Sequence, residues 1–178
     1  DRMARTGTGV AHCPVSNLRL GSGIAPVPAM LEAGVPVGLA VDGSASNDSS
    51  NLLREAQVGM LVHRVGTAVE SMPARRMLRL ATAGGAAVLG RDDIGVLAPG
   101  KAADLAMYDL RGLAYAGALH DPVSALLFCG VDQRAELVMV NGAIVVRGHH
   151  LVRVDEEKVA ECARRASRRL LRAAGIVA

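Results

Sequence analysis

The order of two short apolar strands and two helices within the first 65 residues most constrains what this chain can fold into. The apolar stretches 10–14 and 35–42 predict strands, and the segments 24–33 and 51–65 predict the helices that follow them. Consecutive strands joined through a helix run parallel, because a parallel pair needs a long crossover connection. The sequence therefore predicts an α/β fold with a parallel sheet or barrel.

The second predicted strand ends in an acid. In VPVGLAVD (35–42), Val and Leu alternate with the small residues Pro, Gly and Ala, as in a buried strand, and Asp42 closes the run. Parallel α/β architectures collect ligands and catalytic groups at the carboxyl ends of their strands. Asp42 is therefore a candidate catalytic residue. Alternatively, it caps the turn or helix that follows, as Asp before Gly-Ser often does.

Other polar side chains follow both predicted strands. They are His12, Ser16 and Asn17 after the first strand, and Ser44, Ser46 and Asn47 after the second. Neighbouring strands lie about 5 Å apart, so these side chains are expected along one edge of the sheet. Such an edge offers a carboxylate, hydroxyls and amides to a polar ligand, but the spacing alone indicates no particular reaction.

Composition narrows the class of protein. Hydrophobic residues make up 51% of the 178 residues and aromatics only 2%, so the core must be built from aliphatic side chains and Met. The net charge of +3 is modest, and many arginines fall in an amphipathic helix predicted over 155–175. Acids near the start of that helix and arginines near its end suit the helix dipole, and Glu161 with Arg165 has i,i+4 spacing. Neither nucleic acid nor a membrane surface is indicated as a partner.

Cysteine usage indicates the cellular compartment, and the first residues indicate which part of a protein this chain forms. Cys13, Cys129 and Cys162 are widely spaced with no CxxC, which favours a reduced, cytoplasmic protein. No run of about 18 apolar residues and no export signal is seen. Residues 1–7 resemble the last turn of a helix closed by Gly7, without an initiator Met. We therefore expect the C-terminal part of a longer protein.

The rest of the chain changes from helices to a small β layer. A loop is predicted over 15–23, and one or two helices over 72–89, starting at Pro73 and broken at Gly84-Gly85. Two strands joined by a Pro-Gly turn are predicted over 94–108, a short helix or strand over 124–129, and a hairpin turning at Asn141-Gly142 over 135–146. The expected divisions are 1–91, 92–152 with an intervening barrel-packing segment at about 112–130, and 153–178.

Four segments carry a resemblance to a known family. HCPVSN (12–17) and VDGSASND (41–48) resemble the seventh and eighth strands of an amidohydrolase-superfamily barrel, in the branch of aminohydrolases that act on purines, pyrimidines and triazines. GVLAPGKAADLAMYDL (95–110) and LVMVNGAIVVRG (137–148) resemble strands of that superfamily's small β-sandwich. The resemblance spans nearly the whole chain. It implies the C-terminal part of a (β/α)8 TIM barrel plus part of a small β-sandwich domain.

The resemblance also implies a role for Asp42. It matches the eighth-strand aspartate, which in the family binds one divalent metal, usually Zn²⁺ and alternatively Fe²⁺, and moves a proton between water and leaving group. Such a metal lowers the pKa of bound water from about 15.7 to about 7. The family's other ligands, an HxH pair and a fifth-strand His, and its further acid/base residues, a Glu and a sixth-strand His, have no match here. The chain by itself is therefore expected to be inactive.

The remaining site residues are assigned less specifically. His12, Ser16 and Asn17 match the HCPxSN motif and are implied to shape the substrate pocket, with a structural role for His12 favoured over metal binding. Ser44, Ser46 and Asn47 are implied to orient Asp42 or contact the substrate base, and helix capping is an equal alternative. Cys13 is expected to pack rather than react. His63 is expected at the surface or an interface.

Within the branch, DGSASNDSSNLLREA (42–56) and the segment 91–128 most resemble the members that deaminate 8-oxoguanine. This implies hydrolysis of a small-molecule purine to urate and ammonia by a homo-oligomeric enzyme. Two alternatives stay open. One is a related substrate, such as another purine, a pyrimidine or an s-triazine that loses an amine or chloride. The other is a non-catalytic homologue that uses the same scaffold.

Overall fold

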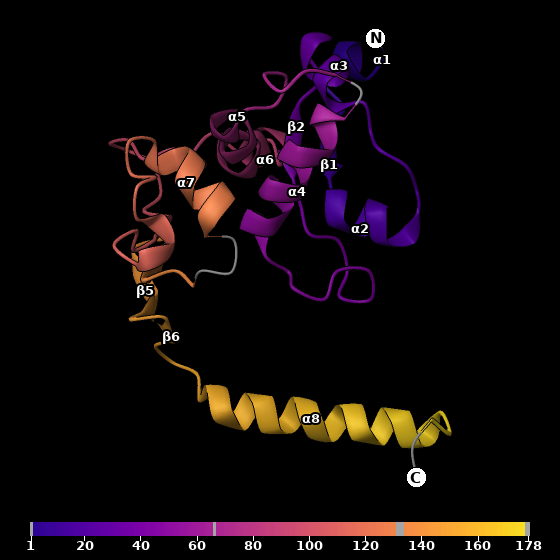
Figure 1. Ribbon diagram of the computed structural model, residues 1–178, viewed down its shortest axis with the longest axis vertical. Helices are drawn as coiled ribbons and strands as arrows, with labels where there is room; N and C mark the ends of the chain where they lie inside the picture. Colours follow the sequence, from indigo (N-terminus) through magenta and orange to yellow (C-terminus); the bar gives the residue numbers. More distant parts are fainter. Residues whose placement is uncertain (1, 66, 131–133, 177–178) are drawn as a thin grey trace. The chain divides into compact units, whose positions relative to one another are not determined.

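The computed structural model describes residues 2–65, 67–130 and 134–176 (Figure 1). Asp1 and residues 177–178, which belong to the predicted terminal segments, lie outside the described residues. The chain divides into two compact units. Unit 1 comprises 1–103 and 109–133, and unit 2 comprises 104–108 and 134–178.

Unit 1 contains the predicted parallel strand pair. β1 (Val10–His12) pairs with β2 (Val37–Leu39), with Val10 opposite Val37 and His12 opposite Leu39. A further bond from the Ala40 amide to the His12 carbonyl, 2.9 Å long, extends the pairing by one residue. The prediction of parallel pairing is confirmed. β2 ends at Leu39 rather than at the predicted Asp42, because β1 gives way to a helix at Pro14 and the bond between Ala40 and His12 is the last one between the two segments.

The polar stretch after β1 is helical rather than a loop. α2 (Pro14–Leu20) starts with Pro14 at an N-terminal position, where proline is tolerated, and ends at Gly21 in the left-handed region with φ 65°. The prediction of a loop over 15–23 is therefore wrong for most of its length. α1 (Arg2–Thr6) precedes β1, and α3 (Val27–Glu32) leads to β2 but starts three residues later than predicted.

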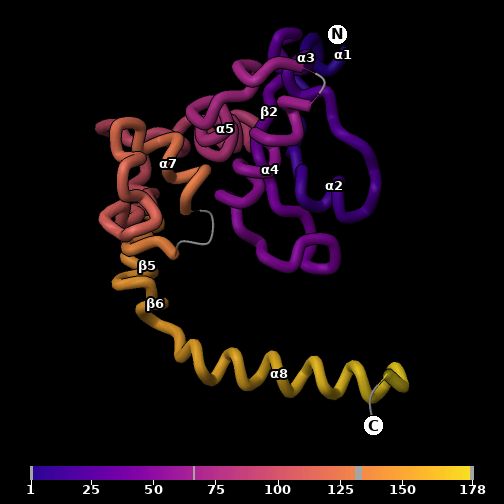
Figure 2. Tube along the Cα trace, in the orientation of Figure 1, coloured from indigo at the N-terminus to yellow at the C-terminus, as the bar shows by residue number. Residues whose placement is uncertain are grey.

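The helix after Asp42 is confirmed as α4 (Leu52–Arg64). Its N-cap is Asn51, whose side chain accepts bonds from the amides of Leu53 and Arg54, so the cap is not one of the earlier polar residues predicted for it. α4 packs against α2 and α5 and lies beside β2 (Figure 2).

The predicted break at Gly84-Gly85 does not occur. α5 (Ala74–Arg79), a π-helical turn η1 (Leu80–Gly84) and α6 (Gly85–Val88) follow one another without an intervening loop. The glycines instead allow close contact with β2. A Cβ atom added at Gly38 would lie 2.8 Å from the Gly85 Cα atom and 2.9 Å from its nitrogen.

The segment over 122–129 is the helix α7 (Pro122–Cys129), which packs against α4, α5 and the 3₁₀ turn η2 (Leu113–Tyr115). Asp121 caps it through the Ser124 amide. The core of unit 1 is aliphatic and Met-rich, as predicted from composition; its fully buried members include Val27, Ala56, Met60, Met72, Met77 and Leu127. Two barrel-type strands and their helices are present among the described residues, and they do not close a barrel.

Unit 2 holds an antiparallel sheet in the order β3 (Leu105–Met107), β4 (Leu137–Val140), β5 (Ala143–Arg147) and β6 (His150–Leu151). The hairpin at Asn141-Gly142 is confirmed, with φ of 46° and 78° at the two turn residues. Only one of the two strands predicted over 94–108 forms. Residues 92–96 are bends in unit 1, where Gly95 takes φ 86° and turns the backbone out of an extended course.

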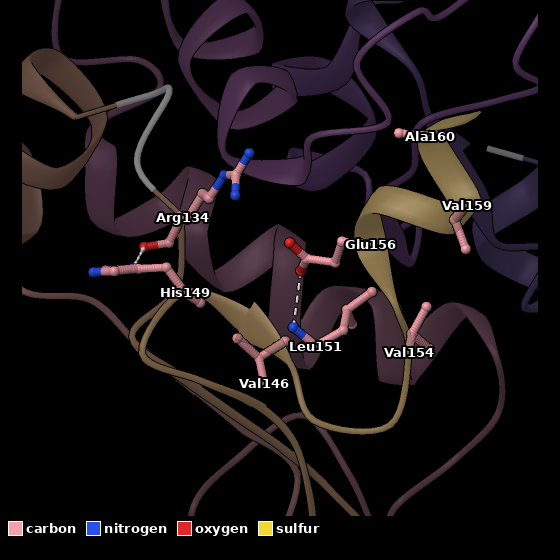
Figure 3. Close-up of a pocket in the computed structure, with 9 residues that line it drawn as sticks. Arg134, Val146, His149, Leu151, Val154, Glu156, Val159 and Ala160 are labelled. Carbon is pink, nitrogen blue, oxygen red and sulfur yellow. Dashed lines mark hydrogen bonds between the residues drawn. The ribbon is translucent and has the colours of Figure 1, made fainter. Parts of the chain in front are cut away.

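The predicted C-terminal helix is α8 (Glu156–Ala173), capped by Asp155 through the Lys158 amide. Glu161 and Arg165 form the expected i,i+4 pair at 3.9 Å. From the first turn, the Glu156 carboxylate reaches back and accepts a 2.9 Å bond from the Leu151 amide (Figure 3). A hollow beside this contact is lined mainly by aliphatic side chains, including Val146, Leu151, Val154 and Val159 (Figure 3). Within the described ranges, no helix has the length and apolar character needed to cross a membrane.

The close packing of β2 on the glycine-containing helix gives a first prediction. Gly38→Ala places a methyl group against the Gly85 backbone, and we expect it to lower the free energy of unfolding by about 1–3 kcal/mol. Urea unfolding of the chain measures this. Gly112→Ala is the control, because its added methyl meets no atom within 4 Å, and a change below about 0.5 kcal/mol is expected. Equal stability of the two variants would contradict the packing described.

Candidate active site

Asp42 lies at the carboxyl end of the parallel strand pair. It follows Ala40, whose amide makes the last bond between the strands, by two residues. Its backbone has φ 65°, in the left-handed region that L-residues seldom enter and that Asp tolerates better than most. Residues held in such conformations cluster at functional sites. This turn leaves the Asp42 side chain exposed at the edge of the sheet.

Two serine hydroxyls hold the Asp42 carboxylate. Ser16 Oγ donates to Asp42 Oδ2 at 2.6 Å, and Ser46 Oγ donates to the same oxygen at 2.9 Å. The Ser16 bond is the main cause that lowers the pKa of Asp42 below its usual value, followed by the Gly43 backbone and Ser46. The ionised carboxylate favoured in this way is the form that can bind a metal ion.

Beneath this edge lies a fully buried acid, Glu55 of α4, with an exposed fraction of 0%. Its Oε2 accepts a 3.0 Å bond from the Val15 amide, and its Oε1 accepts a 2.5 Å bond from Asn47 Nδ2. Burial raises the pKa of Glu55, and the bonds from Val15 and Asn47 act in the opposite direction. Both neighbours are donors, so the geometry requires an acceptor on each carboxylate oxygen.

Asn47 joins this acid to the segment that carries Asp42. Its Nδ2 also donates to the Val41 carbonyl at 2.7 Å, and its Oδ1 accepts a 3.1 Å bond from the Ser50 amide. The side chain is buried, with 1% exposed. Asn47 therefore fixes both the residue before Asp42 and the loop after it.

A pair of buried histidines supports the same region. His63 Nε2 and His12 Nε2 are 3.0 Å apart, and the residues are 4% and 3% exposed. Burial, with a smaller contribution from His63, lowers the pKa of His12 to about 4, and burial also lowers the pKa of His63. Both rings are thus neutral near pH 7, one donating and one accepting. The prediction that His63 lies at the surface is wrong, because α4 turns this residue towards β1.

The structure brings some predicted residues together and leaves others apart. Ser16 and Ser46 contact Asp42, whereas His12 and Asn47 lie in the buried layer beneath it. Ser44 is exposed and Asn17 half-buried, and neither is among the side chains found bonded to Asp42 in the described part of the chain. Cys13 is half-buried and burial raises the pKa of its thiol, which agrees with packing rather than reactivity.

Sequence reasoning missed Glu55 and the burial of His63. A signal was present: Glu55, Gly59 and His63 recur every four residues and share one helical face beside the apolar stripe. A small residue between two ionisable residues on the inward face of a helix indicates a row of buried polar groups. A Cβ added at Gly59 would lie 2.6 Å from Met77 Cε, so the missing side chain leaves room for the buried Met77, while His12 Nε2 would be at an ordinary contact distance of 3.9 Å.

The residues present supply one ligand of a metal site, Asp42, rather than a complete site. Asp42 offers an ionised, oriented and exposed carboxylate. No group of three His, Cys, Asp or Glu side chains suited to a metal is found among the residues that the structure describes. Catalytic zinc sites use three protein ligands and keep one position open, so further ligands would have to come from other strands.

Comparison with known proteins places the chain in a family. The sequence model of the amidohydrolase family matches residues 1–145. The chain belongs to that family, whose type of fold agrees with the parallel strands and the position of Asp42.

Individual relatives differ in what they act on. The 8-oxoguanine deaminase of Pseudomonas aeruginosa is 51% identical over 142 residues, covering 80% of this chain and 31% of that protein. A 5-methylthioadenosine/S-adenosylhomocysteine deaminase of Pelotomaculum thermopropionicum is 42% identical over 162 residues, covering 90% and 37%. The crystal structure of an atrazine chlorohydrolase from Arthrobacter aurescens TC1 complexed with zinc superposes with a TM-score of 0.84 at 42% identity, covering 89% and 35%. The chain spans about a third of the length of these relatives.

The histidine pair predicts how stability depends on pH. An unfolded His binds a proton with a pKa of about 6.5, whereas folded His12 does so only at about 4. The unfolded state therefore binds more protons between these values, and the free energy of unfolding should fall as the pH drops from about 6.5 to about 4.

Urea unfolding at a series of pH values checks this prediction. Replacing His12 with Gln should reduce the loss of unfolding free energy between about pH 6.5 and about pH 4, while the same replacement of exposed His120 should leave that loss unchanged. A His12→Gln variant with an undiminished slope would show that other groups cause the dependence.

Proposed function

We propose that this chain forms the C-terminal part of a metal-dependent aminohydrolase that converts 8-oxoguanine and water to urate and ammonia. The observation that carries the proposal is the Asp42 carboxylate, held ionised by Ser16 and Ser46 at the carboxyl end of β2. Membership of the amidohydrolase family supports it, as does the 51% identity to an 8-oxoguanine deaminase. The zinc in the atrazine chlorohydrolase structure supports a divalent metal as cofactor.

A Zn²⁺ ion, with Asp42 among its ligands, would supply the acidity that makes water nucleophilic near neutral pH. Asp42 would contribute in two ways. The two serines donate to Oδ2, which fixes the carboxylate and leaves Oδ1 without a serine donor. Oδ1 is therefore the atom we assign to accept a proton from the attacking water and pass it to the departing amino group.

We assign the substrate contacts from how exposed each predicted site residue is. Ser44 and Asn17 are the residues best placed for direct contact, because Ser44 is exposed and Asn17 half-buried. Ser46 is half-buried, touches Asp42 and would meet the substrate beside it, whereas Ser16 is only 2% exposed and would meet the substrate at most at the base of the pocket. His12 and Asn47 are buried and would shape the floor of the pocket.

A second candidate keeps the fold and the chemistry but changes the substrate. The relatives that act on 5-methylthioadenosine and atrazine are each 42% identical to this chain. Because one or a few pocket contacts can change which base is accepted, a related purine or an s-triazine is the alternative substrate. In the triazine case the leaving group could be chloride rather than ammonia.

Asp42→Asn in the complete protein tests the mechanism. The amide keeps the shape but cannot carry the proton or the charge, so we expect kcat to fall by about 10²–10⁴-fold. Release of ammonia from 8-oxoguanine is the measurement. Ser22→Ala, a change in the loop after α2, serves as the control and should leave kcat within about twofold. Unchanged turnover in Asp42→Asn would exclude Asp42 as ligand and proton carrier.

A steady-state comparison of 8-oxoguanine, guanine, isocytosine and an s-triazine tests the substrate. We expect the highest kcat/KM for 8-oxoguanine, and loss of turnover after removal of metal by a chelator followed by recovery with Zn²⁺. A higher kcat/KM for the triazine would favour the second candidate. No turnover of any of the four by metal-loaded protein would count against both candidates.

A further inference from the structure

Glu55 is joined to both segments that surround Asp42, although it touches neither Asp42 nor the exposed edge. Through Oε2 it holds the Val15 amide, next to Ser16 in α2. Through Oε1 it holds Asn47, which in turn holds the Val41 carbonyl next to Asp42. Ser16 donates the 2.6 Å bond to Asp42. The Glu55 carboxylate therefore connects two segments to α4: the one with Ser16, which donates the bond, and the one with Asp42, which accepts it.

The start of α2 shows why this carboxylate is needed there. Cys13 occupies the N-cap position but makes no side-chain capping bond, and Pro14 has no amide hydrogen. The Val15 amide would therefore be left without a partner at a helix N-terminus, and Glu55 supplies one from α4. A negative charge at this end is also favoured by the helix dipole.

Replacing Glu55 with glutamine would remove one of its two hydrogen bonds. Val15 and Asn47 both present N–H donors to the side chain. Gln offers one acceptor oxygen and one NH₂ donor, so one of the two partners would face another donor. An unsatisfied group in a fully buried site is costly, and the segment that carries it is expected to shift.

From this arrangement we infer that Glu55 is a positioning residue for the proposed reaction: it sets the Ser16–Asp42 contact by clamping the start of α2 and the Val41–Asn47 loop together. The inference rests on the proposed function of Asp42. Groups that orient metal-binding side chains typically affect metal affinity or activity by 10–100-fold when altered.

The test compares Glu55→Gln, Ser16→Ala and the double variant in the complete protein. Each single change should lower kcat and zinc retention against a chelator by about 10–100-fold, with a smaller effect on KM. In the Ser16→Ala background, Glu55→Gln should lower kcat by less than about threefold, because the contact it sets is already absent. Effects that multiply would overturn the inference.

Two further readouts separate positioning from general stability. Hydrogen exchange at the Val15 amide should accelerate in Glu55→Gln, because its acceptor is lost. Leu53→Ala, also buried on α4, should lower the unfolding midpoint while kcat and zinc retention stay near those of the unaltered protein. If Glu55→Gln behaves like Leu53→Ala in all these measurements, Glu55 is structural only. An active Asp42→Asn would instead refute the proposed function itself.

Discussion

The buried carboxylate of Glu55, with a donor on each oxygen, is the interaction on which the edge of the sheet depends. A carboxyl group buried in the interior is tolerated only when hydrogen bonds replace water, and Val15 and Asn47 provide them. These two partners belong to segments that the chain reaches before and after β2. The requirement to satisfy one buried carboxyl group therefore fixes how the two strand ends are arranged.

The buried histidine pair and the close glycine contacts extend this layer. His12 at the end of β1 and His63 near the end of α4 form a buried hydrogen bond with each other. Burial lowers the pKa of both rings, so both are neutral near pH 7. On another side of β2, Gly38 and Gly85 let a helix approach the strand more closely than any larger residue would. Tight packing and paired polar groups thus position a strand whose end carries a single exposed acid.

Regular patterns allowed much of the fold to be predicted from sequence, and specific contacts account for the errors. Alternation in 35–41 and the apolar stripe of 52–61 indicated β2 and α4, and Asn141-Gly142 indicated the hairpin. The loop prediction at 15–23 failed because the cap of α2 comes from Glu55, which is 40 residues away from Val15 in sequence. The place of Asp42, Ser16 and Ser46 after the strands predicted that these side chains lie close together, and they do. The burial of Glu55 and His63 was not predicted, because a titratable residue on a helix is usually exposed and only tertiary packing buries these two.

The loop between Asp42 and Asn47 is held at both ends: at Val41 by the Asn47 amide, and at Ser50 by the Asn47 carbonyl oxygen. Ser44 and Ala45, in the middle of this loop, are exposed, whereas the Gly43 carbonyl accepts bonds from the Ser46 and Asn47 amides. Variation at the two exposed residues changes what the edge presents without disturbing the frame beneath it. In the proposed site, substitutions confined to Ser44 and Ala45 would therefore change ligand preference at little cost in folding stability.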